Sequence, residues 1–172
     1  MIRHIPNFIC HHYEQGHLSG SLKAFVLLFD IADFTAFGME LQRHGKAGAE
    51  ELSRFLDFIF AEPISIVGRF GGFVSLFAGD AFCAIFPEEK EDVILSAVNS
   101  IRAFFQSNSS YTASSGSFAI IARQTLVYGE IHWQIYENAL QNEYVFYGDP
   151  MQELSKLASG YGSFTEQPGS IV

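Results

Sequence analysis

The sequence has little positive charge, few cysteines and no long apolar run. Lysine and arginine together number 10, against 19 aspartate and glutamate residues, so the formal net charge is −9. This balance argues against nonspecific binding to nucleic acid or to an anionic membrane surface, because both depend on a basic face that displaces counterions. It does not exclude a local site that handles a phosphate group through a bound metal ion.

The longest apolar stretches, such as residues 24–29, fall far short of the ~18 residues that would indicate a membrane-spanning helix. The N-terminus lacks the apolar segment and small-residue cleavage site of a secretory signal. The two cysteines, Cys10 and Cys83, form no metal-binding spacing, which is typical of proteins in a reducing compartment. We therefore predict a cytoplasmic protein without a membrane span.

What the sequence has in quantity is apolar and aromatic material. Its 172 residues are 48% hydrophobic and include 18 phenylalanines. A chain of this length hides roughly 70% of its unfolded surface, so this composition supplies one full core and excludes intrinsic disorder. We expect an irregular N-terminal arm over residues 1–22 and a single domain over residues 23–172. Residues 170–172 resemble the beginning of a strand, which leaves open a truncation of the domain at its C-terminus.

Hydrophobic periodicity predicts alternating strands and helices along the chain. Thr35 is the expected N-cap of the first helix, Pro63 should kink the second, and Gly71 should end it. The serine-rich segment 107–117 indicates a solvated loop. Strands are expected at residues 24–31, 73–77, 80–86, 118–128, 131–136 and 143–147, and helices at residues 35–44, 49–67, 91–105 and 151–158.

The order strand, helix, two-stranded hairpin, helix, strand is that of the split βαβ, ferredoxin-like arrangement. We therefore predict an α+β fold with an antiparallel central sheet and helices on one face. In this topology the first and third strands are antiparallel neighbours, so the end of the first adjoins the start of the third. Asp30 and Asp80 occupy those two positions.

Two carboxylates on adjacent strands, about 4.8 Å apart, can converge on two divalent ions separated by ~4 Å. Magnesium prefers one or two carboxylates plus phosphate oxygens, so Asp30 and Asp80 suffice when a nucleoside triphosphate brings the remaining ligands. The start of the helix at Phe34 and Thr35 adds free backbone N–H groups for the phosphates. Either aspartate alone would more often form a turn than carry catalysis. Their placement on facing strand ends favours the functional interpretation.

These residues carry a resemblance to a known family. The segment FDIADFTA, residues 29–36, resembles the metal-binding strand of class III nucleotidyl cyclases, and FAGDA, residues 77–81, resembles their second metal-binding hairpin. The similarity covers roughly residues 23–160 and is more specific in the first half. The segment IPNF, residues 5–8, is similar to what precedes the first catalytic domain of soluble, bicarbonate-responsive adenylyl cyclases.

The resemblance implies an adenylyl cyclase catalytic domain that converts ATP to cyclic AMP and pyrophosphate at a dimer interface. GTP is the less favoured substrate, and the partner is a second copy of the chain or a complementary cyclase domain. Two Mg²⁺ or Mn²⁺ ions would be held by Asp30, Asp80 and the carbonyl of Ile31. The nucleotide would be bound by the residues that follow, namely Ala32, Asp33, Phe34 and Thr35.

Four positions depart from the pattern of active relatives. Leu76 stands where many have a lysine that reads adenine, and Val145 aligns with a second base-reading position that is usually aspartate or threonine. Gln152 replaces the asparagine that orients the ribose, and Lys156 replaces the arginine that stabilises the transition state. Lysine lacks the bidentate fork of arginine. Gln152 and Lys156 are equally compatible with two exposed positions on a helix.

The metal-binding half of the site is therefore intact in sequence, while the base-reading and transition-state half is eroded. This asymmetry predicts a half-site that resembles the first domain of tandem cyclases and requires a complementary partner. The alternative is a catalytically degenerate cyclase-like module that regulates or dimerises, binding nucleotide or metal without turnover.

Two other signals favour other classes only weakly. The segment RFGG, residues 69–72, is similar to a motif of diguanylate cyclases, but apolar residues follow it where those enzymes have acidic metal ligands. Cys10, His11, His12 and His17 are a candidate metal cluster, although histidines in an irregular arm are more often solvated.

Overall fold

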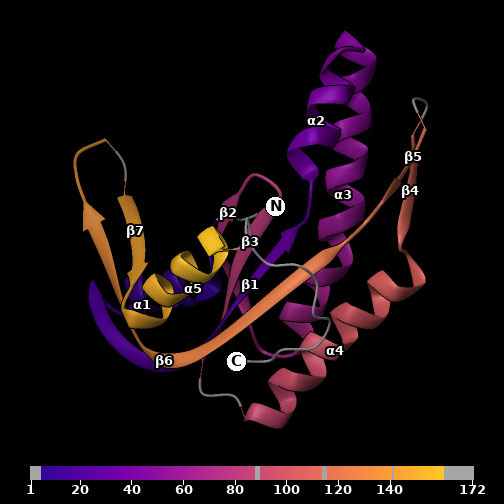
Figure 1. Ribbon diagram of the computed structural model, residues 1–172. Coiled ribbons are helices and arrows are strands. Elements are labelled where there is room, and N and C mark those ends of the chain that lie inside the picture. Colours follow the sequence, from indigo (N-terminus) through magenta and orange to yellow (C-terminus); the bar gives the residue numbers. More distant parts are fainter. Residues whose placement is uncertain (1–4, 88–89, 114–115, 141, 161–172) are drawn as a thin grey trace.

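The computed structural model describes residues 5–87, 90–113, 116–140 and 142–160. Its centre is a five-stranded antiparallel sheet with the order β2-β3-β1-β6-β7 (Figure 1), so the predicted α+β class and antiparallel central sheet are confirmed. A separate two-stranded sheet joins β4 and β5. The strands are β1 (Ser19–Ile31), β2 (Phe73–Ala78), β3 (Ala81–Pro87), β4 (Ser110–Ala113), β5 (Gly116–Ala119), β6 (Ala122–Glu137) and β7 (Asn142–Tyr147).

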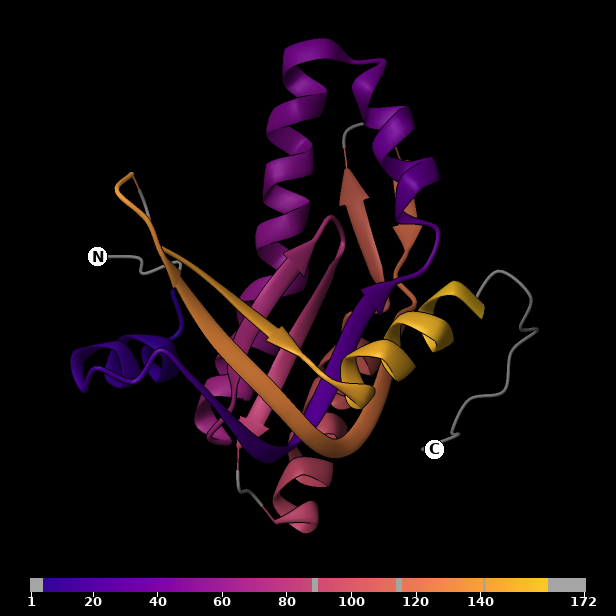
Figure 2. The same cartoon turned by 90° about the vertical axis from the view of Figure 1, so that its left-hand side faces the viewer.

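The helices lie on both faces of the central sheet. The long helices α3 and α4 cover one face, and α1 and α5 lie against the other (Figures 1 and 2). The expectation of helices on one face therefore holds for α3 and α4 but is wrong for α1 and α5. The helices of the described part of the chain are α1 (Asn7–Glu14), α2 (Phe34–Gln42), α3 (Gly45–Arg69), α4 (Glu91–Ser107) and α5 (Asp149–Gly160).

Alternation along β1 explains why both faces are covered. Leu27 and Phe29 are fully buried in the core shared with α3 and α4, whereas Ala24 and Val26 are buried in a second core with α1 and α5. A strand that is apolar at every position needs cover on both sides, because successive side chains point to opposite faces. Residues 24–29 have this composition, so the predicted strand is confirmed and the sheet is a middle layer.

The register of strand pairing determines which residues meet at the end of β1. β1 pairs with β3 in antiparallel fashion up to Phe29 opposite Phe82, as the split βαβ topology predicts. On its other side β1 pairs with β6, and there Asp30 is opposite Arg123. The end of β1 therefore adjoins the β2–β3 turn, which contains Asp80.

The sheet is strongly curved, as Figure 2 shows. Its two edge strands are β2 and β7, yet the rings of Phe73 in β2 and Phe146 in β7 are only 5.6 Å apart. Phe8 of α1 stacks on Phe73 at 5.3 Å and lies 6.0 Å from Phe146. The N-terminal helix thus packs on the concave side of the sheet and contacts both edge strands.

The prediction of an irregular arm is consequently wrong for residues 7–14 and for the start of β1. An eight-residue helix is too short to show a sustained hydrophobic period, and α1 is held by tertiary packing of Phe8 and Ile9 rather than by its own propensity. Residues 19–23 extend β1 because they pair with residues 130–134 of β6.

The serine-rich segment is also not a loop. β4 and β5 form a hairpin in which Tyr111 is opposite Phe118, and the Tyr111 ring contacts Phe55 of α3 at 5.0 Å. A cross-strand aromatic pair that packs against α3 therefore stabilises this hairpin, despite the polar composition around it. Residues 170–172, where we expected another strand to begin, lie outside the described residues.

Two predicted strands, 118–128 and 131–136, form one continuous strand, β6, from residue 122 onward. Gly129 does not interrupt it, because this residue pairs with Ala24 of β1. Pro150 of α5 packs against Gly129, where a Cβ atom would lie 2.7 Å from the proline Cγ. The glycine thus permits close approach of a helix. Helix α3 contains the buried Pro63 and is followed by Gly71 with a φ of 80°, which confirms the predicted end of that helix.

Candidate active site

Asp30 and Asp80 come together at one end of the sheet. Asp30 is the penultimate residue of β1, and Asp80 belongs to the tight turn between β2 and β3, where Gly79 adopts a φ of 65°. The two carboxyl groups hydrogen-bond each other, Ile31 donates its backbone N–H to the Asp30 carboxylate, and Asp80 accepts from its own backbone N–H. The structure therefore brings together the two residues that the sequence placed on facing strand ends.

The electrostatics of this carboxylate pair oppose ionisation. Burial raises the pKa of Asp30 above its ordinary value of 3.8, and the neighbouring charge of Asp80 raises it further. Burial likewise raises the pKa of Asp80. Two close carboxylates in a partly desolvated position attract a cation, and raised pKa values of this kind are typical of functional sites.

Arg123 is the cation that faces the pair, and sequence reasoning missed it. Its Nη1 atom lies 3.9 Å from Oδ2 of Asp30, and its charge acts to lower the pKa of Asp30. The residue reaches this position because β6 pairs with β1. Only knowledge of the strand register identifies it, since in the sequence Arg123 is an isolated basic residue far from both aspartates.

The loop after β1 is tightly constrained. Ala32 is buried, and its backbone N–H donates to the Ile121 carbonyl at 2.9 Å, so in this arrangement it is not directed towards a ligand. Asp33, not Thr35, is the N-cap of α2, and it adopts a left-handed φ of 60° without a side-chain cap bond. The expectation that Thr35 caps the helix is therefore wrong. A non-glycine residue in this conformation costs of order 1 kcal/mol and occurs preferentially at functional sites.

The first turn of α2 has backbone donors available for an anion. The helix begins at Phe34, so the N–H groups of its first residues lack partners within the helix. The Phe34 ring is half-buried against Phe55, while Thr35 is exposed.

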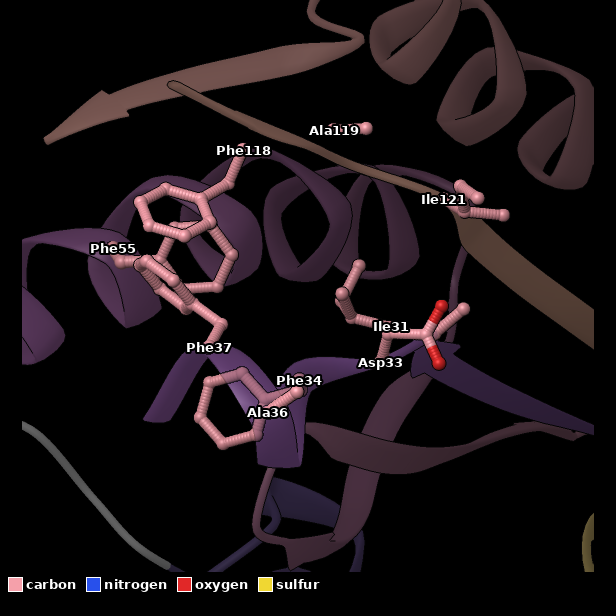
Figure 3. Close-up of a pocket in the computed structure, with 10 residues that line it drawn as sticks. Ile31, Asp33, Phe34, Ala36, Phe37, Phe55, Phe118, Ala119 and Ile121 are labelled. Atoms are coloured by element: carbon pink, nitrogen blue, oxygen red, sulfur yellow. The ribbon is translucent and has the colours of Figure 1, made fainter. Parts of the chain in front are cut away.

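A pocket of about 330 Å³ lies directly behind this loop. In Figure 3 the rings of Phe37, Phe55 and Phe118 gather on one side of it, and Asp33 lies near Ile31 and Ile121. The pocket is lined mainly by apolar side chains. Its lining residues pack behind the loop and present few polar groups that could bind a phosphate.

The two base-reading candidates are on the edge strands. Leu76 is 58% exposed in β2, next to a bulge, and Val145 is 37% exposed in β7. Neither side chain can donate or accept a hydrogen bond. The structure thus presents two apolar side chains to solvent at the positions where we expected base recognition.

Gln152 and Lys156 are one helical turn apart on α5, and both are exposed. The Gln152 N–H donates to Gly148 at 3.2 Å within the first turn of the helix. Leu154 between them is buried in the second core.

The donor set fits a hard divalent cation that shares its ligands with a phosphate. Asp30 and Asp80 offer carboxylate oxygens, the kind of donor that Mg²⁺ and Mn²⁺ prefer, and Mg²⁺ commonly uses only one or two carboxylates beside substrate phosphates.

Among the described residues, no three His, Cys, Asp or Glu side chains are arranged to hold a metal ion. Cys10, His11, His12 and His17 therefore do not form such a group in the described part of the chain. No helix there is long and apolar enough to cross a membrane.

The fold is shared with solved cyclase domains, although no protein-family model and no curated protein matches the sequence. A bacterial light-regulated adenylyl cyclase superimposes with a TM-score of 0.70 at 17% identity, covering 92% of this chain and 48% of that one. The guanylyl cyclase domain of the RhoGC fusion protein from the aquatic fungus Blastocladiella emersonii gives 0.62 at 18% identity, covering 83% and 76%. The adenylyl cyclase CyaB from P. aeruginosa gives 0.59 at 18%, covering 83% and 74%. The chain has the fold of nucleotidyl cyclase catalytic domains.

Proposed function

We propose that this chain is the metal-binding half of a class III nucleotidyl cyclase that makes cyclic AMP and pyrophosphate from ATP. The observation that carries the proposal is the convergence of Asp30 and Asp80 at the end of β1, on a fold shared with adenylyl and guanylyl cyclases. The resemblance of residues 29–36 and 77–81 to the metal-binding segments of this family supports the same conclusion.

Asp30, Asp80 and the carbonyl of Ile31 are the groups that would hold two Mg²⁺ or Mn²⁺ ions. Bound there, such ions supply a Lewis acid for the ribose 3′-hydroxyl and neutralise charge on the triphosphate. The N–H groups at Phe34 and Thr35 orient phosphate oxygens at the start of α2. In the reaction the 3′-oxygen bonds to the α-phosphorus, the bond to pyrophosphate breaks, and the hydroxyl proton passes to solvent.

The other half of the reaction is left to a partner. The side chains of Leu76 and Val145 cannot hydrogen-bond a base, so neither can select adenine over guanine through a side-chain hydrogen bond. ATP is favoured through the family resemblance, and the solved structures with the same fold include both adenylyl and guanylyl cyclases. A complementary domain, in the same longer protein or in a partner chain, supplies the base-reading and transition-state groups.

A second candidate function rests on those same apolar side chains. A module with Leu76 and Val145 exposed in place of polar groups could bind metal and nucleotide, or only dimerise, and regulate an attached effector without turnover. Robust cyclic AMP formation by a homodimer of the isolated chain would exclude this candidate.

The test is cyclic AMP formation from Mn²⁺-ATP by the full-length natural protein. We expect Asp30→Asn and Asp80→Asn each to reduce the rate at least a hundredfold, because each removes an anionic ligand and leaves the side-chain volume unchanged. Asp57→Asn, an exposed change on α3, is the matched control and should leave the rate unchanged. Activity that survives both substitutions in the carboxylate pair would contradict the proposal.

A further inference from the structure

Arg123 competes for the carboxylate that a metal would use. Its guanidinium lies 3.9 Å from Asp30, and the side chains of Arg123 and Asp30 are 34% and 24% exposed. This separation is longer than a hydrogen bond, so the two groups attract each other through charge alone. The strand register fixes the pairing, since Arg123 is directly opposite Asp30 in the β1–β6 ladder.

A divalent cation at Asp30 would therefore sit close to a permanent positive charge. The guanidinium stays charged at every physiological pH and cannot relieve this repulsion by losing a proton. Because the site is partly buried, solvent and salt screen the repulsion less than at an open surface. A nucleoside triphosphate brings negative charge that offsets the guanidinium and the metal together.

We propose that Arg123 lowers the affinity of the Asp30–Asp80 pair for divalent metal in the absence of nucleotide, so that metal binding depends on the triphosphate. The inference rests on the proposed function, in which this pair is the metal site. It assigns Arg123 the role of a built-in competitor that keeps the carboxylate pair from holding metal alone. Metal and nucleotide then bind as a unit.

The experiment is a titration of the purified chain with Mn²⁺ alone, followed by electron paramagnetic resonance of the free ion. Arg123→Gln should bind Mn²⁺ about three- to tenfold more tightly than the unsubstituted chain, the range expected for one partly screened charge. Arg123→Lys keeps the charge and should bind as the unsubstituted chain does. Arg102→Gln makes the same change in net charge on the exposed side of α4 and should have no effect.

A second titration, in the presence of 3′-deoxy-ATP, tests the dependence on nucleotide. The nucleotide should increase Mn²⁺ affinity more in the unsubstituted chain than in Arg123→Gln, because only the former has a repulsion to offset. Circular dichroism and thermal unfolding of each variant show that the comparison is between folded proteins.

The outcomes separate this inference from the proposed function. Mn²⁺ binding that survives both Asp30→Asn and Asp80→Asn overturns the metal site itself. Binding that requires the aspartates but is unchanged or weaker in Arg123→Gln overturns only the role of Arg123. Failure of both the unsubstituted chain and Arg123→Gln to bind Mn²⁺ without nucleotide also overturns it, since removal of the competitor should then have revealed binding.

Discussion

At the scale of single residues, the carboxylate pair carries an unfavourable charge arrangement that the fold maintains. The pKa values of Asp30 and Asp80 are both raised, chiefly by burial, so the folded protein takes up protons at these groups more readily than the unfolded chain. Stability at this site is therefore greatest at low pH. It falls as the pH rises from the ordinary value of 3.8 through the raised pKa values.

Asp30→Asn should make the metal-free protein more stable at pH 7, by about 1 kcal/mol, because the amide removes a partly buried charge and its repulsion with Asp80. The gain should disappear below the ordinary aspartate pKa of 3.8, where the native carboxyl is neutral as well. Urea unfolding between pH 3 and pH 7 in the presence of a chelator measures it. Asp57→Asn should give no comparable gain, and a loss of stability in Asp30→Asn at pH 7 would contradict the argument.

At the scale of elements, the close crossing of α2 and α3 depends on one glycine. A Cβ atom at Gly48 would lie 1.8 Å from the backbone oxygen of Leu41, the last buried residue of α2, so backbone would have to move. Gly48→Ala should therefore destabilise the protein by about 2–4 kcal/mol, as overpacking against a rigid neighbour does.

Gly68 is the matched control within the same helix. Nothing lies within 4 Å of a Cβ atom placed there, so Gly68→Ala should stabilise the protein by about 0.5–1 kcal/mol through helix propensity. Chemical denaturation of both variants measures the opposite signs. Equal changes in stability at the two positions would mean that the close packing of α2 against α3 does not require a glycine at position 48.

The N-terminal helix gives a second prediction at this scale. Ile9 is 4% exposed in the core on the concave side of the sheet, so Ile9→Ala should cost about 2–4 kcal/mol of stability. His11 is exposed on the same helix, and His11→Ala should change stability by less than about 0.5 kcal/mol. Thermal unfolding distinguishes them. If the two variants unfold alike, α1 is an appendage rather than part of the core.

Sequence reasoning succeeded where the deciding interactions are local or periodic. The buried strand at residues 24–31, the hairpin around Gly79 and the long helices follow from composition and period, and with them the meeting of Asp30 and Asp80. It failed where tertiary contacts decide. Helix α1 exists because Phe8 fills the curve of the sheet, the β4–β5 hairpin because Tyr111 packs on Phe55, and Arg123 joins the site through strand register.

At the scale of the whole molecule, the division between an intact metal-binding half and an eroded half can be tested by complementation. The first protein is the unsubstituted chain, which has Asp30 and Asp80. The second carries Leu76→Lys, Val145→Asp, Gln152→Asn and Lys156→Arg, the residues that active cyclases have there, together with Asp30→Asn. Neither protein alone has both halves of a site, so neither homodimer should make cyclic AMP.

A mixture of the two should make cyclic AMP at least tenfold faster than either alone, because one site of the heterodimer combines the carboxylate pair of one chain with the restored groups of the other. The four substitutions without Asp30→Asn should give an active homodimer with two complete sites. All four positions are exposed, so the changes should leave the core intact. Sedimentation analysis shows whether the chains associate. An associated mixture without activity would contradict a site shared across the interface, whereas activity in the Asp30→Asn variant alone would contradict the role of the carboxylate pair.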